Sequence, residues 1–259
     1  MISVCLATYN GEKYLREQID SILNQLTRED ELIISDDESN DNTIDIIKSY
    51  NDKRIKLFHH KKNFCRFAYY YTTLNFQNAL QKAKGDFIFL ADQDDVWLPN
   101  KIEQMSNILK ECDLVLSDCS IVDSKLDILV LSKFLLENVK IGICRNLYKS
   151  SYQGCCMGIR KDFVEKILPF PKNVAHDLWL GITCNIIGKM QLLKEQTMLY
   201  RRHNNNVSAT KKSLLSKQNP NDAIRLNKNG NSLWFQFSYR FIFIMNMFSF
   251  YINKKILKR

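Results

Sequence analysis

Segments typical of strands and segments typical of helices alternate over the first third of this chain. Residues 2–7 are short and apolar, as a buried strand would be, whereas residues 12–26 place leucine and isoleucine at helical spacing. The same patterns predict strands at residues 31–35, 54–60 and 86–91 and helices at residues 43–50 and 67–84. Such alternation favours an α/β domain with a mostly parallel central sheet and helices on both faces.

The rest of the chain continues the pattern less regularly. Pro99 suits the first turn of a helix, which apolar residues continue to Leu109. A strand is predicted at residues 113–117, a turn or strand at 151–160, a helix at 176–188 and a late strand at 190–200. Residues 123–149 give no clear pattern, and we expect loops near the functional site there. We therefore expect one domain over residues 1–210 and a segment of different character over residues 211–259.

Polar side chains follow three of the predicted strands, at the point where each strand ends. Thr8, Tyr9 and Asn10 follow the first strand, residues 36–39 (DDES) follow the second, and residues 92–95 (DQDD) follow the fourth. In such sheets ligands bind beyond the carboxyl ends of the strands. Three clusters that are distant in sequence are therefore expected to meet at one edge of the sheet.

The DQDD cluster places several negative charges next to a predicted buried strand. Carboxylates repel one another, and unpaired charge near a core is costly. Asp92 and Asp94 lie two residues apart on a turn and can point toward one hard cation such as Mn²⁺ or Mg²⁺, which also binds phosphate oxygens. Acidic turns are common without metal, so Asp92–Gln93–Asp94 alone is weak evidence for a metal site. Its position at the sheet edge, beside two other polar clusters, makes a metal site the better interpretation.

The net charge of +9 is confined to the last fifth of the chain. Residues 211–259 hold ten Lys or Arg and one acidic residue, which accounts for the whole excess, so residues 1–210 are neutral. Residues 211–232 are polar and suit a linker, whereas residues 233–252 are apolar and rich in aromatics. We interpret residues 211–259 as a basic linker and an amphipathic helical tail that associates with membranes. The alternative is a C-terminal helix packed on the domain.

Six motifs within the first 210 residues together resemble glycosyltransferase family 2. They are VCLATYNGEKYL at 4–15, SDDESNDNT at 35–43, ADQDDVW at 91–97, GCCMGIRKD at 154–162, HDLW at 176–179 and YRRHNNNVS at 200–208. The resemblance implies a GT-A fold, which is Rossmann-like, and a metal-dependent, inverting transfer of a sugar. Members with DQDD, HDxW and YRxHxNN resemble bacterial glucosyl-, galactosyl- and rhamnosyltransferases of O-antigen and capsule synthesis.

The resemblance also implies roles for the matched residues. Asp177 would be the catalytic base, although without the resemblance an acidic helix start is the simpler interpretation. The nucleotide-sugar would be bound by Thr8, Tyr9, Asn10, Asp37, Asp92 and Asp95. The metal, Mn²⁺ or Mg²⁺, would be held by Asp94 with His203. The sugar and acceptor pocket would include Trp97, Trp179, His176 and Gly154.

These features together predict an enzyme that transfers a hexose to a lipid-linked acceptor. Our first expectation is a β-1,3 transfer of glucose from UDP-glucose to N-acetylglucosaminyl-diphospho-undecaprenol, with UDP-galactose or dTDP-rhamnose as alternative donors. The first residues lack the basic start and apolar run of a secretory signal. We therefore expect a peripheral protein on the cytoplasmic side of the bacterial inner membrane.

Two other classes of function are less well supported. A sugar-phosphate nucleotidyltransferase would carry a glycine-rich phosphate loop after the first strand, which ATYNGEKYL lacks. A non-catalytic protein that binds nucleic acid would carry excess positive charge on its folded domain, and residues 1–210 carry none. The expected partners are thus a nucleotide-sugar, a lipid-linked acceptor and an anionic membrane surface, without nucleic acid.

Overall fold

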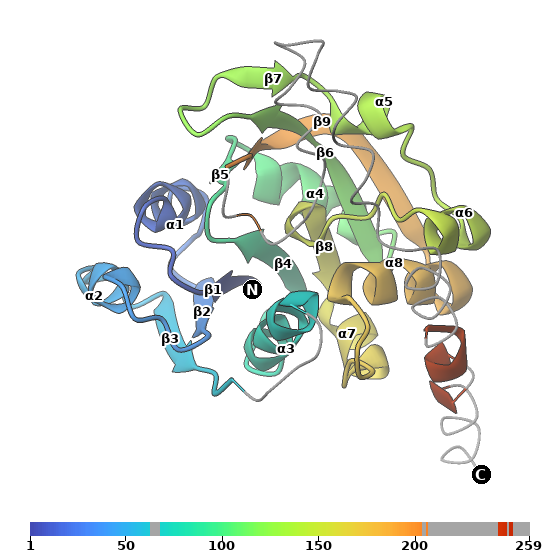
Figure 1. Ribbon diagram of the computed structural model, residues 1–259, viewed down its shortest axis with the longest axis horizontal. Coiled ribbons are helices and arrows are strands. Elements are labelled where there is room, and N and C mark those ends of the chain that lie inside the picture. The colour runs from blue at the N-terminus through green and yellow to red at the C-terminus, as the bar shows by residue number, and fades with distance from the viewer. Residues whose placement is uncertain (63–67, 204–205, 207–242, 248, 251–259) are drawn as a thin grey trace, which may run out of the picture.

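The computed structural model of the 259-residue chain describes residues 1–62, 68–203, 206, 243–247 and 249–250. Among these residues nine strands form one sheet (Figure 1). The strands are β1 (Ile2–Thr8), β2 (Glu31–Asp36), β3 (Ile55–His59), β4 (Phe87–Asp92), β5 (Val96–Trp97), β6 (Leu114–Val122), β7 (Ile128–Val130), β8 (Met157–Arg160) and β9 (Met190–Arg201). The helices are α1 (Leu15–Leu23), α2 (Thr43–Lys48), α3 (Ala68–Leu80), α4 (Lys101–Leu109), α5 (Lys133–Glu137), α6 (Ile143–Tyr148), the 3₁₀ turn η1 (Gly154–Cys156), α7 (Lys161–Ile167) and α8 (His176–Ile187).

The sheet is mostly parallel, as the sequence predicts. Its strand order is β3-β2-β1-β4-β8-β6-β9-β5, and β7 pairs with β6. Strands β1 to β4 run parallel to one another, whereas β8 lies antiparallel between β4 and β6. Helices α1 and α2 lie on one side of β1–β3 and α3 lies on the other (Figure 1). The predicted alternation of strands and helices is therefore confirmed.

The register of the parallel strands brings their carboxyl ends together. Thr8 of β1 pairs with Asp36 of β2, and Ala7 pairs with Asp92 of β4. Asp36 in turn pairs with His59 of β3. The strand ends that carry the polar clusters thus lie at one edge of the sheet, because the buried apolar residues before them hold the strands in register.

Several elements are not predicted from the sequence. Strand β5 has two residues, too few to show a period. Strand β7 and helices α5 and α6 lie within residues 123–149, where many apolar side chains are exposed and mark no buried face. The predicted strand at 113–117 extends to Val122, since all nine residues of β6 are buried.

Part of the C-terminal tail packs on the domain. Residues 243–247 are helical, and Phe243 and Met247 are buried. The Trp179 ring in α8 makes T-shaped contacts with Phe243 and Phe250, at centroid distances of 5.7 and 5.3 Å. Trp179 is fully buried, and its indole N–H donates to the Ile167 carbonyl at 3.3 Å. The prediction that Trp179 lines a sugar pocket is therefore corrected: it is a core residue that seats the C-terminal helix.

The same contacts bear on the two interpretations of the tail. For the described tail residues the structure shows the packed helix, although Ile244 and Met245 stay exposed. The predicted linker at 211–232 and the basic end at 251–259 lie outside the described residues. Within the part of the chain that the structure describes, every helix is too short or too polar to cross a membrane.

Candidate active site

Hydrogen bonds join the turns that follow β1 and β2. The Thr8 hydroxyl donates to Asp36 Oδ1 at 2.9 Å, and Asp36 Oδ2 accepts the backbone N–H of Ser39 at 2.9 Å. Asn10 has a φ of 49°, in the left-handed region that asparagine tolerates. Its side-chain oxygen accepts the backbone N–H of Asn40 at 2.9 Å. These bonds hold the two strand ends next to each other.

A cavity of about 420 Å³ opens at this edge of the sheet. It is lined by eight of the predicted site residues: Thr8, Tyr9, Asp37, Asp92, Asp94, Gly154, His176 and Asp177. A neighbouring hollow of about 660 Å³ contains Asn10 and His203 and shares Tyr9, Gln93 and Asp94 with the cavity. The remaining three predicted residues, Asp95, Trp97 and Trp179, are buried and line neither space.

An aromatic ring and a buried carboxylate border the cavity where β1 and β2 end. Asp37 Oδ1 lies 2.5 Å from His60 Nδ1. Burial raises the pKa of Asp37, and the hydrogen bond from His60 and the charge of Lys62 oppose that rise. The Lys62 ammonium lies over the half-exposed ring of Tyr9. A ring that can stack beside a carboxylate that can accept an N–H suits a nucleobase.

The acidic loop that begins at the end of β4 places two carboxylates, Asp92 and Asp94, at the cavity wall and one, Asp95, beneath it. Burial, and then the charge of Asp94, raise the pKa of Asp92 to about 7. Asp95 is fully buried, and burial followed by the charges of Asp94 and Asp92 raises its pKa well above the ordinary value. Its Oδ1 accepts the Arg201 backbone N–H at 3.0 Å, and its Oδ2 has no hydrogen-bond partner among the described residues. Asp95 therefore supports the loop from below, which corrects its predicted place in the nucleotide-sugar contact.

Arg201, at the end of β9, ties this loop to two other segments. Its Nε donates to the Asp94 carbonyl at 2.8 Å, and its NH1 donates to the Ser124 carbonyl at 3.0 Å. Its NH2 pairs with Glu17 of α1 at 2.5 Å. Because the guanidinium is buried, these bonds fix the backbone of the acidic loop.

A carboxylate, an imidazole and an amide meet between the cavity and the hollow. Asp94 Oδ2 lies 2.7 Å from His203 Nε2 and accepts a hydrogen bond from Asn206 Nδ2 at 2.9 Å. A carboxylate beside an imidazole suits a first-row ion such as Mn²⁺, and carboxylate oxygen suits Mg²⁺. Asp92, Asp95 and Cys155 also place one ligand atom each within 4.8 Å of one another. Asp94 and His203 thus offer ligand types that suit the divalent ion expected from the sequence, whereas the sulfur of Cys155 suits softer ions.

Asp177 stands in the first turn of α8 and faces the same cavity. Its Oδ1 accepts the Leu178 backbone N–H at 2.6 Å. The preceding His176 is buried: its backbone N–H donates to the Thr73 hydroxyl at 3.1 Å, and its ring packs on Phe76 at a centroid distance of 4.4 Å. Burial lowers the pKa of His176 and the neighbouring Asp177 opposes that shift, so the imidazole is neutral near pH 7.

Most of the chain that carries this site is similar to proteins that are already classified. Residues 3–168 match the family described as Glycosyl transferase family 2. The chain belongs to glycosyltransferase family 2. It is 31% identical to an uncharacterised glycosyltransferase of Rickettsia typhi over 191 residues, which are 69% of this chain and 57% of that protein. The chain thus spans little more than half the length of that relative.

A second curated relative of this family 2 glycosyltransferase has a named activity. It is the Escherichia coli protein WfgD, a UDP-Glc:alpha-D-GlcNAc-diphosphoundecaprenol beta-1,3-glucosyltransferase. The identity is 36% over 112 residues, which are 42% of this chain and 42% of WfgD.

Solved structures confirm the predicted fold of the glycosyltransferase. S. aureus TarS in complex with UDP-GlcNAc aligns with a TM-score of 0.64 at 20% identity, over 81% of this chain and 61% of that one. The mannosyltransferase PcManGT from Pyrobaculum calidifontis, in complex with GDP-Man and Mn²⁺, aligns with a TM-score of 0.56 at 17% identity, over 78% and 56%. The predicted GT-A fold is therefore confirmed.

Gly154 lets the cavity wall approach His176 closely. A Cβ at this position would lie 2.4 Å from His176 Nε2. Because the histidine ring is packed on Phe76, it cannot move aside at low cost. We expect Gly154→Ala to lower the free energy of unfolding by about 1–3 kcal/mol, measured by urea denaturation. In a His176→Ala background, Gly154→Ala should lower the free energy of unfolding much less. An equal decrease in both backgrounds would contradict a steric clash with His176.

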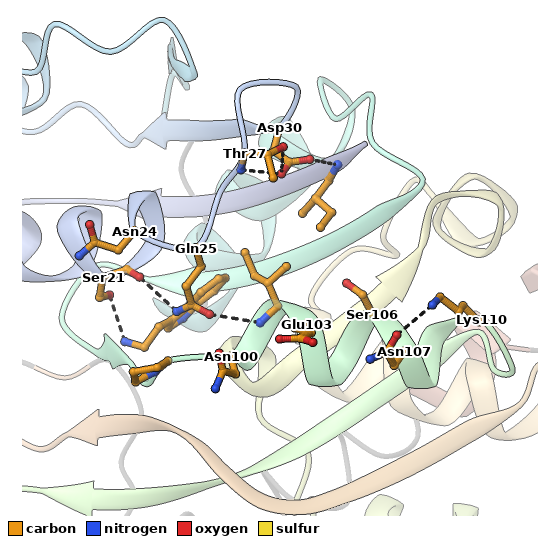
Figure 2. Close-up of a pocket in the computed structure, with 14 residues that line it drawn as sticks. Ser21, Asn24, Gln25, Thr27, Asp30, Asn100, Glu103, Ser106, Asn107 and Lys110 are labelled. Carbon is orange, nitrogen blue, oxygen red and sulfur yellow. Dashed lines mark hydrogen bonds between the residues drawn. The ribbon is translucent and has the colours of Figure 1, made fainter.

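A further hollow, of about 600 Å³, lies between α1 and α4 at the opposite end of the strands (Figure 2). Several of its polar side chains bind the protein itself, whereas the buried Ser106 hydroxyl has no hydrogen-bond partner among the described residues. Gln25 donates to the Ser21 carbonyl at 3.2 Å and accepts the Ile102 backbone N–H at 3.3 Å. Asp30 accepts the Ile2 backbone N–H at 2.7 Å. Figure 2 shows these bonds joining the end of α1, the start of β1 and α4, so the hollow is a structural junction.

Trp97 belongs to this junction and to the core of the glycosyltransferase. The residue is buried, its ring contacts Phe89 edge-on at a centroid distance of 6.2 Å, and the Lys101 ammonium lies 4.9 Å from its centroid. Its backbone N–H donates to the Ser21 hydroxyl at 3.0 Å. The prediction that Trp97 lines the sugar pocket is corrected, because its ring packs against Phe89 and lies at the hollow between α1 and α4.

Sequence reasoning missed several residues of the cavity wall. Lys133 and Glu137 of α5 line the cavity and form an ion pair at 2.7 Å. Both lie in residues 123–149, for which the sequence indicates no more than loops near the site. Asn75 of α3 also lines the cavity, and its amide donates to the Thr8 carbonyl at 3.0 Å. The sequence of α3 holds several polar residues, so no local signal distinguishes Asn75 from the others.

Proposed function

We propose that this glycosyltransferase is an inverting, divalent-metal-dependent hexosyltransferase that acts on a lipid-linked acceptor. One observation supports the proposal: Asp94, which contacts His203, and Asp177 line a single cavity although they come from distant elements. In this proposal Asp94 serves the leaving diphosphate and Asp177 the attacking hydroxyl.

The nucleotide of the donor would bind where β1 and β2 end. Tyr9 offers a half-exposed ring for stacking, and Asp37 offers a carboxylate to a base N–H. Asp92 would accept hydrogen bonds from the ribose. Thr8 supports this arrangement from below, since its hydroxyl holds Asp36 and its carbonyl is held by Asn75.

The divalent ion would be held by Asp94 with His203 beside it. When bound, the ion would neutralise negative charge on the departing nucleoside diphosphate. Asn206 and His203 both contact Oδ2 of Asp94, and Arg201 holds its backbone carbonyl. These bonds orient the carboxylate before the donor arrives.

Asp177 would act as the general base. It would take the proton from the acceptor hydroxyl while that oxygen attacks the anomeric carbon from the face opposite the diphosphate. The Leu178 backbone N–H holds Oδ1, so we assign Oδ2 as the atom that accepts the proton. Attack from the opposite face inverts the anomeric configuration, so an α-linked donor yields a β-linked product.

The proposed substrates rest on the likeness to WfgD. The name of that enzyme describes transfer of glucose from UDP-glucose to N-acetylglucosaminyl-diphospho-undecaprenol in a β-1,3 linkage. We propose the same donor, acceptor and linkage here, as a step of O-antigen or other surface polysaccharide synthesis. UDP-galactose and dTDP-rhamnose are the second candidates for the donor.

We also propose peripheral association with the cytoplasmic side of the bacterial inner membrane. A lipid-linked acceptor resides in a bilayer, and the excess charge of residues 211–259 favours anionic headgroups.

The proposal predicts that transfer depends on a divalent ion and inverts the anomeric centre. The full-length chain is expected to join glucose from UDP-glucose to a synthetic N-acetylglucosaminyl-diphospholipid. EDTA should stop the reaction, and excess Mn²⁺ or Mg²⁺ should restore it. UDP-galactose and dTDP-rhamnose serve as matched donors, and NMR of the product reports the linkage. Full activity in EDTA would contradict the requirement for a metal ion, and an α-linked product from the α-linked donor UDP-glucose would contradict inversion.

A further inference from the structure

Exposed apolar side chains are concentrated in one short segment of the chain. Of the fourteen large apolar side chains that are exposed among the described residues, eight lie between residues 128 and 148. The most exposed are Leu135 at 85%, Tyr148 at 73% and Leu131 at 70%. Single exposed apolar residues are ordinary, but a contiguous patch on a folded protein marks a contact surface.

The segment forms a continuous margin of the molecule. It comprises β7, α5 and α6, which follow one another along one side in Figure 1. The inner face of this margin is fixed: the Ser132 hydroxyl donates to Asp118, and α6 packs against α8. We call residues 128–148 the apolar strip. Its outward leucines and isoleucines are thus presented by ordered elements.

Unpaired positive charges accompany the apolar strip. Lys140 and Lys149 are exposed and form no ion pair with another described residue, and the exposed Arg145 donates to the Glu137 and Asn138 carbonyls at 3.1 and 2.7 Å. The exposed Lys125 lies between Asp123 and Asp127 in the sequence. The acidic residue of α5, Glu137, is already paired with Lys133. Apolar side chains flanked by exposed Lys and Arg are typical of proteins that lie on anionic bilayers.

The apolar strip is also continuous with the cavity of the glycosyltransferase. Lys133 and Glu137 of α5 line the cavity on one side and belong to the strip. Ser150 and Tyr152, just after the strip, line the same cavity. A surface in contact with the strip would therefore lie next to the cavity opening.

We propose that the apolar strip docks on an anionic lipid bilayer and thereby holds the cavity next to the membrane surface. Leucine and isoleucine side chains would enter the headgroup region while Lys140, Arg145 and Lys149 contact lipid phosphates. The orientation of the cavity toward a lipid-linked acceptor rests on the proposed function, whereas binding of the strip to lipid does not. This surface belongs to residues 128–148, a different part of the sequence from the basic residues of the tail at 211–259.

The test measures binding of the full-length chain to phosphatidylcholine vesicles with and without phosphatidylglycerol, by co-sedimentation. Leu131→Gln combined with Leu135→Gln is expected to weaken binding to the anionic vesicles by about ten-fold or more. The matched control is Ile186→Gln combined with Ile187→Gln, two side chains that are 42% and 43% exposed at the end of α8 and lie outside both the strip and the tail. This control pair should change binding by less than about two-fold.

A second pair of variants tests the charges. Lys140→Gln combined with Lys149→Gln should weaken binding to anionic vesicles alone, whereas Lys48→Gln combined with Lys53→Gln removes the same charge from exposed lysines in and after α2 and should have little effect. Equal effects of the two pairs would show that the net charge of the protein, and not a particular surface, attracts the vesicles. That result would overturn the proposal. Thermal unfolding should be unchanged in all four variants.

Two other results would also overturn the proposal. The first is wild-type vesicle binding by the Leu131→Gln, Leu135→Gln variant. The second is a wild-type dimer in sedimentation equilibrium that this variant converts to a monomer, which would make the strip an interface between copies of the chain. Sugar transfer to a short-chain, water-soluble acceptor, measured without vesicles, separates the two proposals. Sugar transfer without vesicle binding would contradict only the docking of the apolar strip on a bilayer. Vesicle binding without sugar transfer would contradict only the proposed function.

Discussion

Replacement of Asp177 by asparagine is expected to abolish sugar transfer while leaving donor binding intact. Asparagine has the same shape, and its Oδ1 can still accept the Leu178 backbone N–H, so the first turn of α8 is retained. It cannot take a proton from the acceptor hydroxyl, and loss of a general base typically lowers the rate by about 10²- to 10⁴-fold. The measurements are kcat for transfer and, by calorimetry, Kd for the nucleotide-sugar.

The control for this prediction is an acidic residue in the same position of another helix. Asp162 lies in the first turn of α7, outside the cavity, where it pairs with Arg160 at 3.0 Å. If Asp177 only stabilised a helix start, Asp177→Asn and Asp162→Asn would each cost up to about 1 kcal/mol of stability and leave kcat unchanged. Wild-type kcat in Asp177→Asn would therefore reject the base assignment, and Asp162→Asn should retain full activity.

The parts of the site that lie at strand ends are predictable from the sequence. A run of apolar residues predicts a buried parallel strand. The register of that strand against its neighbour places the residues that follow it at the edge of the sheet where the carboxyl ends lie. Thr8, Asp36 and Asp92 illustrate this, because the pairing of β1 with β2 and β4 brings them together. Their convergence follows from the fold, and no knowledge of side-chain packing is needed to expect it.

Burial of individual side chains could not be predicted in the same way. Trp97 and Trp179 each follow a polar cluster, as a residue of a sugar pocket would, yet both rings lie in the core. Asp95 adjoins the cavity-lining Asp94, but its carboxylate is turned inward to the Arg201 backbone N–H, 106 positions away in sequence. Such contacts depend on loops and on β9, whose placement no local pattern reveals.

Replacement of Asp94 by alanine is expected to abolish sugar transfer, and added metal ion should not restore it. Asp94 is the carboxylate that His203 and Asn206 hold at the junction of the cavity and the hollow. Without it, a divalent ion would lose its principal oxygen ligand, and the loss of the charge neutralisation such an ion supplies is worth several kcal/mol in the transition state. We expect a fall in kcat/KM of at least about 10³-fold, which excess Mn²⁺ or Mg²⁺ does not restore. Asp86→Ala, at the other end of β4 and on the surface, should retain wild-type kinetics.

The stability of Asp94→Ala separates a ligand role from a structural one. Burial and the charge of Asp94 raise the pKa of Asp92 to about 7, so the folded chain loses stability as pH rises from the ordinary carboxylate range through 7. Removal of Asp94 lowers the pKa of Asp92 and so restores part of the free energy of unfolding that is lost at high pH. This gain offsets the loss of the hydrogen bonds that His203 and Asn206 make to Asp94. In EDTA at about pH 8, the unfolding free energy should therefore fall by less than about 1 kcal/mol, measured by urea denaturation. A much larger fall would mean that Asp94 holds the loop together and that its loss inactivates the enzyme through misfolding.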